Sequence, residues 1–476
     1  MTRGDLDITG LDGNRVALSP GDLGALATRV AGRLLRAGDD GWDDAVLIWN
    51  GMVASIPALV LQPASAADVA EAVRFAADRR LLLSVKGGGH NIAGTSIAPG
   101  GLTLDMSRLR DVTVDVAGRR AHVGAGCLIK DVDSATQQHG LAAVLGFVSE
   151  TGVAGLTLGG GMGYLTRRFG WTVDNLDEVE VVTADGRILT AGPEENPELF
   201  WALRGGGGNF GVATRFTLRL HEVGPTVTGG LIAWGAERAG EVLAAYHELT
   251  ESAPRELTTA LTIRLAPPTP FMPPEWHGKA IAGMVVCHSG ADPSGDLAPL
   301  RSLGEPIVDL ISEKPYTAQQ SMLDATQPKG AHYYWKSEFV PTLSAAFLDN
   351  FRSEALKVTS PMSQSIIFHL AGALNEREDD DGAMGNRDAG YVTAFAGSWP
   401  PADTRSAEHV AWVRESWGKI RSFSTGGNYV NFQVADDDDA RTASAYRGNY
   451  ARLQRVKSAV DPSNLFRVNR NVTPPS

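Results

Sequence analysis

Three glycine-rich blocks, at residues 86–91, 146–163 and 204–211, constrain most strongly what this chain can fold into. The first block follows a short apolar run at 81–85 that predicts a buried strand, and it ends in His90 and an asparagine. Adjacent glycines let a backbone turn tightly and approach a flat or anionic ligand, because no Cβ atom stands in the way. From the residues alone, both a ligand-binding role and a structural role stay open for His90.

The third block matches a dinucleotide-binding pattern but stands in the wrong context. Gly206, Gly208 and Gly211 satisfy G-x-G-x-x-G, which indicates a Rossmann turn only where a strand precedes it and a helix follows. Here residues 196–203 predict a helix before the block, and residues 212–220 alternate like a strand after it. We therefore exclude a nicotinamide dinucleotide site of the Rossmann type.

Strands, glycine turns and helices alternate through the first half, which is typical of an α+β or α/β core. Asp185-Gly186, between two apolar runs, predicts a hairpin, and the acidic run 436–439 predicts a helix N-terminus. From about 225 to 427 the glycine blocks stop and prolines and aromatic residues gather, which predicts a second domain that shapes a substrate pocket. Each glycine block alone would be explained by a tight loop. Three of them, without a Rossmann context, favour a flavin site of another type.

Composition excludes several other classes. The chain has 476 residues, enough for two domains, and its net charge of -12 argues against a nucleic-acid partner. No apolar run is long enough to span a membrane, so we expect no membrane partner and a cytoplasmic location. Cys127 and Cys287 are too few for a disulfide framework and form no metal-ligand cluster, so no metal is expected. The sequence leaves the oligomeric state open.

The glycine blocks and the C-terminal tail together resemble the berberine-bridge-enzyme-like branch of the vanillyl-alcohol oxidase/p-cresol methylhydroxylase (PCMH) flavoproteins. The resemblance runs from about Trp49 to Asn471 and is weakest between 225 and 425. It implies an α+β fold with an FAD-binding domain of PCMH type in two subdomains, and a substrate domain with a large antiparallel sheet flanked by helices. The segments that match are 86–91, 152–161, 204–211, 429–432 and 461–467; the implied domains are 1–224 (core about 52–222), 225–427, and a segment 428–476 that returns to the FAD domain.

The resemblance also implies that FAD is the cofactor, bonded covalently to His90 through its 8α-methyl carbon. Some relatives add a second bond from a cysteine, but Val148 stands at that position here and Cys127 lies in a different turn. We therefore expect a single covalent bond. The residues expected to bind the cofactor are Lys86, Gly87, Gly88, Gly89, His90, Asn91, Thr151, Gly152, Val153, Gly155, Thr157, Gly159, Gly160, Gly161, Gly163, Gly208, Asn209, Gly211, Val212, Asn431 and Asn469.

The implied reaction is hydride transfer from an alcohol, sugar or secondary metabolite to the flavin, which dioxygen reoxidises to give hydrogen peroxide. Val153 aligns with a position that gates oxygen in relatives, and a valine there favours an oxidase. Tyr429 matches the tyrosine of a Y-x-N motif, with Asn431 beside it, and is expected to take the second proton from the substrate. That role requires a lowered tyrosine pKa, and Lys336 is a candidate cation for it.

Two further residues are expected at the substrate pocket, namely Tyr334 and His369. Structural roles stay open for His369 and for Tyr429, which could be a buried sheet tyrosine. Two other enzyme classes also stay open: a flavin dehydrogenase with a non-oxygen acceptor, and an oxidative tailoring or cyclising enzyme of natural-product biosynthesis. A flavin-loaded protein kept for binding or structure is the non-enzyme alternative, which Tyr429 and Asn431 disfavour.

Overall fold

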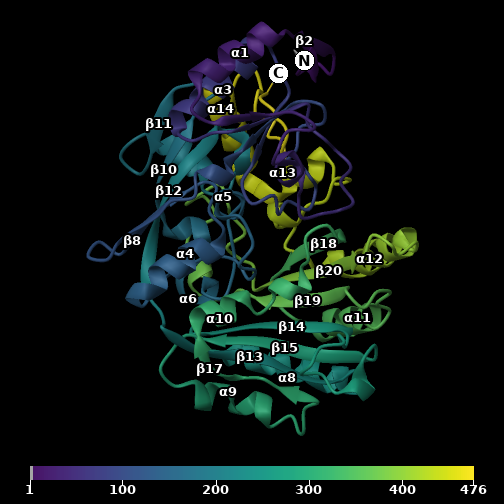
Figure 1. The fold of residues 1–476 in the computed structure, drawn as a ribbon. Coiled ribbons are helices and arrows are strands. Elements are labelled where there is room, and N and C mark those ends of the chain that lie inside the picture. Colours follow the sequence, from purple (N-terminus) through teal and green to yellow (C-terminus); the bar gives the residue numbers. More distant parts are fainter. Residues whose placement is uncertain (1–3, 476) are drawn as a thin grey trace.

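The computed structural model describes residues 4–475, which form two packed α+β parts (Figure 1). The upper part in Figure 1 contains the N-terminal half of the chain and the C-terminal tail. The lower part is built around one large sheet from the middle of the sequence. Segments near the two ends of the described residues lie close together (Figure 1), and Arg467 donates a hydrogen bond to the carbonyl of Leu11.

The first part contains three sheets among the described residues. A four-stranded sheet has the order β3-β4-β6-β5, with β4 and β5 parallel to β6, and its β5 runs directly into the first glycine block. A six-stranded sheet has the order β11-β10-β12-β8-β7, with β9 on β12, and β1 and β2 form a separate pair. These strands are β1 (Leu6–Thr9), β2 (Arg15–Leu18), β3 (Arg33–Leu35), β4 (Leu59–Gln62), β5 (Leu83–Lys86), β6 (Leu102–Asp105), β7 (Val112–Asp115), β8 (Arg120–Gly124), β9 (Leu141–Ala143), β10 (Leu176–Val182), β11 (Ile188–Ala191) and β12 (Val212–Glu222).

Local sequence signals set several of these elements. The predicted hairpin at Asp185-Gly186 joins β10 and β11, which pair antiparallel, and Gly186 has the positive φ of 77° that such a turn requires. The third glycine block lies between a helix and strand β12, as its context predicts. The helices of this part are α1 (Pro20–Arg29), α2 (Trp42–Val46), α3 (Ala66–Asp78), α4 (Ile129–Thr136), α5 (Val153–Leu158), α6 (Thr166–Phe169), α7 (Pro197–Leu203), α13 (Asp439–Tyr446) and α14 (Tyr450–Val460).

The second part is an antiparallel sheet of eight strands in the order β16-β13-β15-β14-β19-β20-β18, with β17 on β13. Helices α8, α11 and α12 contact this sheet, and α11 also contacts the other two, so the three helices cover the same face of it. The other face is turned toward the first part (Figure 1). The elements are β13 (Thr226–Gly235), β14 (Leu257–Leu265), β15 (Ala280–His288), β16 (Val308–Asp309), β17 (Ser312–Pro315), β18 (His332–Val340), β19 (Gln364–His369), β20 (Tyr391–Trp399), α8 (Ala239–Ser252), α9 (Pro293–Arg301), α10 (Tyr316–Ser321), α11 (Ala345–Ala355) and α12 (Ser406–Ile420).

The chain returns to the first part at its C-terminal end, where α13 and α14 lie beside the N-terminal elements (Figure 1). The side chain of Lys457 in α14 donates hydrogen bonds to the carbonyls of Asn209 and Phe466, at 2.8 and 2.9 Å. Its ammonium also pairs with Asp461 at 2.7 Å, and both side chains are fully buried. The tail is thus fixed beneath the third glycine block. Across residues 4–475, no helix has the length and apolar character needed to cross a membrane.

Candidate active site

A deep cavity lies between the two parts, and all three glycine blocks contribute to its wall. Strands β14, β15, β18 and β19 of the large sheet close it on one side, and residues 429–432 of the tail form another wall. Residues 466–470 complete the far end. Segments distant in the sequence therefore meet at one site, as expected for a cofactor held between two domains.

Glycines leave room in this cavity that other residues would fill. Gly155 and Gly208 both line it, and a Cβ atom built on either meets nothing within 4 Å. Buried polar atoms at the far end also lack hydrogen-bond partners among the described residues: Tyr446 Oη, Asn469 Oδ1 and Arg470 Nε. Open backbone surfaces beside unpaired donors and acceptors suit a ligand with flat rings and phosphates, such as FAD.

His90 also lines the cavity, and an aromatic stack holds its ring. Its ring stacks on Trp49 with 4.4 Å between ring centroids, and Trp49 stacks in turn on Tyr333 at 3.6 Å. Burial lowers the pKa of His90 to about 4, so the imidazole is neutral at physiological pH. The Nε2 atom is buried and has no hydrogen-bond partner in the described chain. A neutral imidazole with a free nitrogen fits a bond to the cofactor.

Tyr429 is buried at the cavity wall and accepts a hydrogen bond from Asn431 Nδ2 at 3.0 Å. Burial raises the pKa of Tyr429 to about 12, although Asn431 and the backbone amides of Gly161 and Met162 act in the opposite direction. The expected lowering of this pKa is therefore wrong, because the hydrogen-bond donors do not outweigh desolvation. The phenol is protonated at neutral pH.

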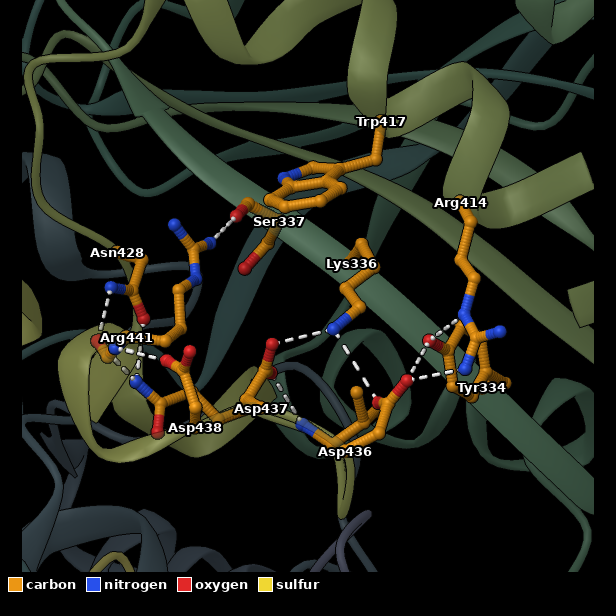
Figure 2. A network of polar contacts seen from close by, with 12 residues as sticks. Tyr334, Lys336, Ser337, Arg414, Trp417, Asn428, Asp436, Asp437, Asp438 and Arg441 are labelled. Carbon is orange, nitrogen blue, oxygen red and sulfur yellow. Dashed lines mark hydrogen bonds and ion pairs between the residues drawn. The ribbon is translucent and has the colours of Figure 1, made fainter. Parts of the chain in front are cut away.

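The expected placement of Lys336 and Tyr334 needs correction, because neither lines the cavity. Side chains alternate along β18, and it is Trp335 that lines the cavity, so its two neighbours face helix α12. Lys336 Nζ pairs with Asp437 at 2.5 Å and with Asp436 at 3.5 Å (Figure 2). Tyr334 donates its hydroxyl to Asp436 at 2.7 Å, as Figure 2 also shows. These contacts of Lys336 and Tyr334 with Asp436 and Asp437 fix the tail against the sheet. Lys336 is therefore not the cation beside Tyr429.

His369 on β19 likewise lies one position away from the residue that lines the cavity. Phe368 lines the cavity, whereas His369 stacks on Tyr391 with 5.2 Å between ring centroids. Burial, with a smaller contribution from Arg167, lowers the pKa of His369 well below its usual value. His369 is thus a neutral histidine behind the cavity wall, and its expected role in the substrate pocket is corrected to packing.

Part of the second glycine block also lies outside the cavity, because its glycines make room for protein atoms. A Cβ atom on Gly159 would lie 2.0 Å from the Asn431 side chain, one on Gly160 2.9 Å from Met384, and one on Gly163 1.8 Å from the carbonyl of Leu145. These glycines permit close packing. The residues expected at the cofactor that do not line the cavity are Lys86, Val153, Thr157, Gly159, Gly160, Gly161 and Gly163.

Two of these residues have identifiable structural roles. Lys86 is buried, donates to the carbonyl of Ala45 at 2.6 Å and lies 3.8 Å from Asp105. Val153 is fully buried in the core of the first part, whereas Thr151 of the same block lines the cavity. An oxygen-gating side chain must reach the cavity, so the structure does not place Val153 where that expectation requires.

The remaining predicted residues do line the cavity: Tyr429 stays our predicted catalytic residue, and the others stay our predicted cofactor contacts. Sequence reasoning missed several other wall residues, because apolar and aromatic side chains on strands carry no signal that separates a cavity wall from a core. Side chains alternate between the two faces of a strand, so the sequence divides them into two sets. Only the orientation of the sheet shows which of the two sets faces the cavity. Predicted residues at the wall are Gly87, Gly88, Gly89, His90, Asn91, Thr151, Gly152, Gly155, Gly208, Asn209, Gly211, Val212, Tyr429, Asn431 and Asn469; missed ones include Trp49, Phe147, Trp335, Gln364, Phe368, Tyr446 and Arg470.

Known flavoproteins resemble this chain in sequence over nearly its whole length. The family model described as "FAD binding domain" matches residues 57–192, and "Berberine and berberine like" matches residues 428–473. (R)-6-hydroxynicotine oxidase of Paenarthrobacter nicotinovorans is 31% identical over 460 residues, covering 94% of this chain and 97% of that protein. An FAD-linked oxidoreductase of Dictyostelium discoideum is 30% identical over 431 residues, covering 90% and 91% of the two chains.

Solved structures show the same fold. The crystal structure of 6-hydroxy-D-nicotine oxidase from Arthrobacter nicotinovorans superposes with a TM-score of 0.83 at 28% identity, covering 94% of this chain and 98% of that one. A chitooligosaccharide oxidase also gives 0.83, at 20% identity and with coverage of 96% and 100%, and supports the fold alone.

The fold and the cavity define a flavoprotein of the PCMH type, with an α+β architecture in two parts. More narrowly, the chain belongs to the berberine-bridge-enzyme-like family of FAD-linked oxidoreductases. It is thus an oxidoreductase with FAD as its cofactor.

Proposed function

We propose that the protein is an oxidase in which FAD is bonded covalently to His90. The observation that carries this proposal is the buried, unpaired Nε2 atom of a neutral imidazole at the cavity wall. A neutral nitrogen keeps the lone pair that a new bond needs. Val148 lines the cavity at the position where some relatives carry a second attachment cysteine, so a single bond is proposed.

The chemistry that bound FAD would supply is two-electron oxidation: a hydride leaves a substrate C–H bond, and both electrons pass to dioxygen with two protons to give hydrogen peroxide. The 31% identical relative is an oxidase, which supports dioxygen as the acceptor. A substrate that loses a hydride next to an O–H or N–H group must also lose a proton.

We propose that Tyr429 handles this proton. Its hydroxyl lies at the cavity wall, and the donor Asn431 at 3.0 Å stabilises negative charge on the phenolic oxygen. Since the pKa of Tyr429 is about 12, only a small phenolate fraction exists at neutral pH and this fraction grows with pH. The wall around it is apolar, with Phe432 packed edge-on to Tyr429 at 4.9 Å between ring centroids. This packing fixes the ring and keeps water from it.

The experiment is acid precipitation of the purified protein, with intact mass and absorbance of the pellet, for the wild type and for His90→Ala. A yellow wild-type pellet with the mass of one FAD and a colourless variant pellet are expected. Flavin that stays bonded in the variant would contradict the assignment to His90. Oxygen consumption against dye reduction then separates an oxidase from a dehydrogenase with another acceptor.

A tailoring or cyclising enzyme of natural-product biosynthesis would use the same first oxidation and differ afterwards. Product mass alone does not distinguish the two outcomes, because simple oxidation and oxidative cyclisation both remove two hydrogens from the substrate; the fragmentation pattern of the product shows whether its skeleton is rearranged. Chromatographic comparison of products with an authentic ketone or aldehyde standard completes this test.

A further inference from the structure

We propose that the substrate is an uncharged, largely apolar ring compound with one polar group that Gln364 recognises. This inference rests on the proposed function and adds the chemical class of the substrate. It concerns the wall that the large sheet contributes to the cavity, opposite the glycine blocks.

Aromatic and aliphatic side chains dominate that wall. Phe368 of β19 and Trp335 of β18 line the cavity, with Ile366 and Val285 beside them. Phe147, from the second glycine block, stacks on Phe368 with 4.9 Å between ring centroids and extends the apolar surface. Flat aromatic walls favour a planar apolar ligand, because stacking contacts and burial of apolar area add together.

The same wall offers no ionic partner. Among the described residues from 225 to 427 that line the cavity, none is Asp, Glu, Lys, Arg or His. Elsewhere on the wall His90 is neutral, and the one charged residue among the described lining residues, Arg470, belongs to the tail segment 466–470, where its unpaired Nε is assigned to the cofactor. A charged substrate would lose its hydration here without gaining a counterion, which is strongly unfavourable. The cavity therefore selects for neutral molecules.

Gln364 supplies the polar contact. Its Oε1 atom accepts a hydrogen bond from Thr262 at 3.4 Å, which orients the amide. Its Nε2 atom makes no hydrogen bond within the described chain and is free to donate to a carbonyl or hydroxyl oxygen. Gln364 and Thr262 are polar side chains that the sheet contributes to the wall, and Trp335 adds an indole N–H without a hydrogen-bond partner in the described chain. Thr326 and Gln327, from the loop before β18, line the cavity as well. An oligosaccharide would leave most of its hydroxyl groups unpaired against such a surface.

The test is calorimetric titration of the flavin-loaded protein with three probes of one shape and different charge: benzamide, benzoate and benzylammonium. Cellobiose serves as the sugar probe. Benzamide is expected to bind at least tenfold more tightly than benzoate or benzylammonium, and cellobiose to give no binding heat. Equal or tighter binding of a charged probe or of cellobiose overturns the proposal, as does the absence of benzamide binding.

Two variants assign the contact to Gln364. Gln364→Leu should weaken benzamide at least fivefold, and Gln364→Glu should weaken benzamide while strengthening benzylammonium at least tenfold. Gln138→Glu, on the exposed surface, is the matched charge control and should change neither. Unchanged preferences in Gln364→Glu would overturn the role of this residue. Because binding heat needs neither turnover nor a covalent bond, a failure of the proposed oxidase reaction stays distinguishable from a failure of this inference.

Discussion

Gly88 and Gly152 meet backbone to backbone, so closely that no side chain fits between them. A Cβ atom on Gly88 would lie 2.5 Å from the nitrogen of Gly152, and one on Gly152 would lie 2.3 Å from the nitrogen of Gly88. Both residues also line the cavity. The contact fixes the first and second glycine blocks to each other. The shape of the cavity therefore requires that neither position carries a Cβ atom.

We expect Gly88→Ala to lower the free energy of unfolding by about 1–3 kcal/mol, because the added methyl group forces rigid backbone apart. Flavin content should fall with it. Gly418→Ala is the matched control: Gly418 lies inside α12, a Cβ atom there meets nothing within 4 Å, and the change should stabilise by about 0.5–1 kcal/mol. Urea unfolding and the ratio of flavin to protein absorbance measure both effects. A stable, fully loaded Gly88→Ala protein would contradict the contact.

The low pKa of His90, about 4, predicts how cofactor attachment depends on pH. The imidazole stays neutral down to about pH 5, so the rate of acid-stable flavin attachment to flavin-free protein should change less than about twofold between pH 8 and pH 5.5. An ordinary histidine, with a pKa near 6.5, would give roughly a tenfold fall. Stopped incubations with FAD, followed by intact mass, measure the rate.

The same shift affects stability. Since the folded pKa of His90 lies below its unfolded value, the unfolded chain binds more protons between about pH 6.5 and pH 4, so stability falls as the pH falls through this range. In flavin-free protein, His90→Gln should remove this part of the pH dependence in urea unfolding.

Tyr429→Phe should reduce turnover by about 10²–10⁴-fold while the flavin stays bound, because the proton acceptor is lost and the ring is kept. Turnover of the wild type should rise with pH beyond pH 10, since burial holds the pKa of Tyr429 at about 12. The variant should lose this rise. Tyr450→Phe, outside the cavity wall, serves as the control. A plateau near neutral pH in the wild type would exclude Tyr429 as the group that titrates.

Lys457→Met should cost about 3–5 kcal/mol, because it leaves the carboxylate of Asp461 buried and unpaired. It also removes the donor that holds the carbonyls of Asn209 and Phe466. The double variant Lys457→Met/Asp461→Asn should recover part of the loss, since no buried charge remains. If the double variant is as unstable as the single one, the ion pair is not the origin of the effect. Urea unfolding of the two variants and of the wild type gives the comparison.

Lys336→Met tests the corrected role of this lysine. Removal of the partner of Asp437 should destabilise the protein by about 3 kcal/mol, because both side chains are buried. The pH dependence of turnover should not change, since Lys336 faces α12 and does not line the cavity. A displaced pH profile would restore Lys336 as a partner of Tyr429. Arg405→Met, which removes an exposed arginine paired with the partly buried Asp403, is the control for loss of a surface cation.

Local signals predicted the elements of the fold where a few neighbouring residues decide the conformation. Asp438 caps α13 as the acidic run indicates, accepting a hydrogen bond from the backbone of Arg441 at 2.8 Å. Asp436 and Asp437 of the same acidic run have a role that the run does not indicate, because they pair with Lys336, a residue about 100 positions away. A sequence read locally contains no information on such a partner.

The candidate site was predicted well in its loops and poorly on its strands. Tyr334, Lys336 and His369 each stand one residue away from a side chain that lines the cavity, because the face of a strand that meets the cavity depends on which face the helices cover. Gly159 illustrates a second difficulty. A glycine that admits a ligand and a glycine that admits another side chain, here Asn431, look the same in one sequence.

The long separation in sequence of the cavity wall, from Trp49 to Arg470, has a consequence for biosynthesis. While the ribosome is still translating the middle of the chain, the N-terminal sheets can form, but the wall that the tail supplies does not yet exist. FAD therefore meets a finished pocket only after residue 470 has left the exit tunnel. We therefore expect cofactor capture to be a late event in the maturation of this protein, with the glycine loops uncovered until the tail has folded onto them.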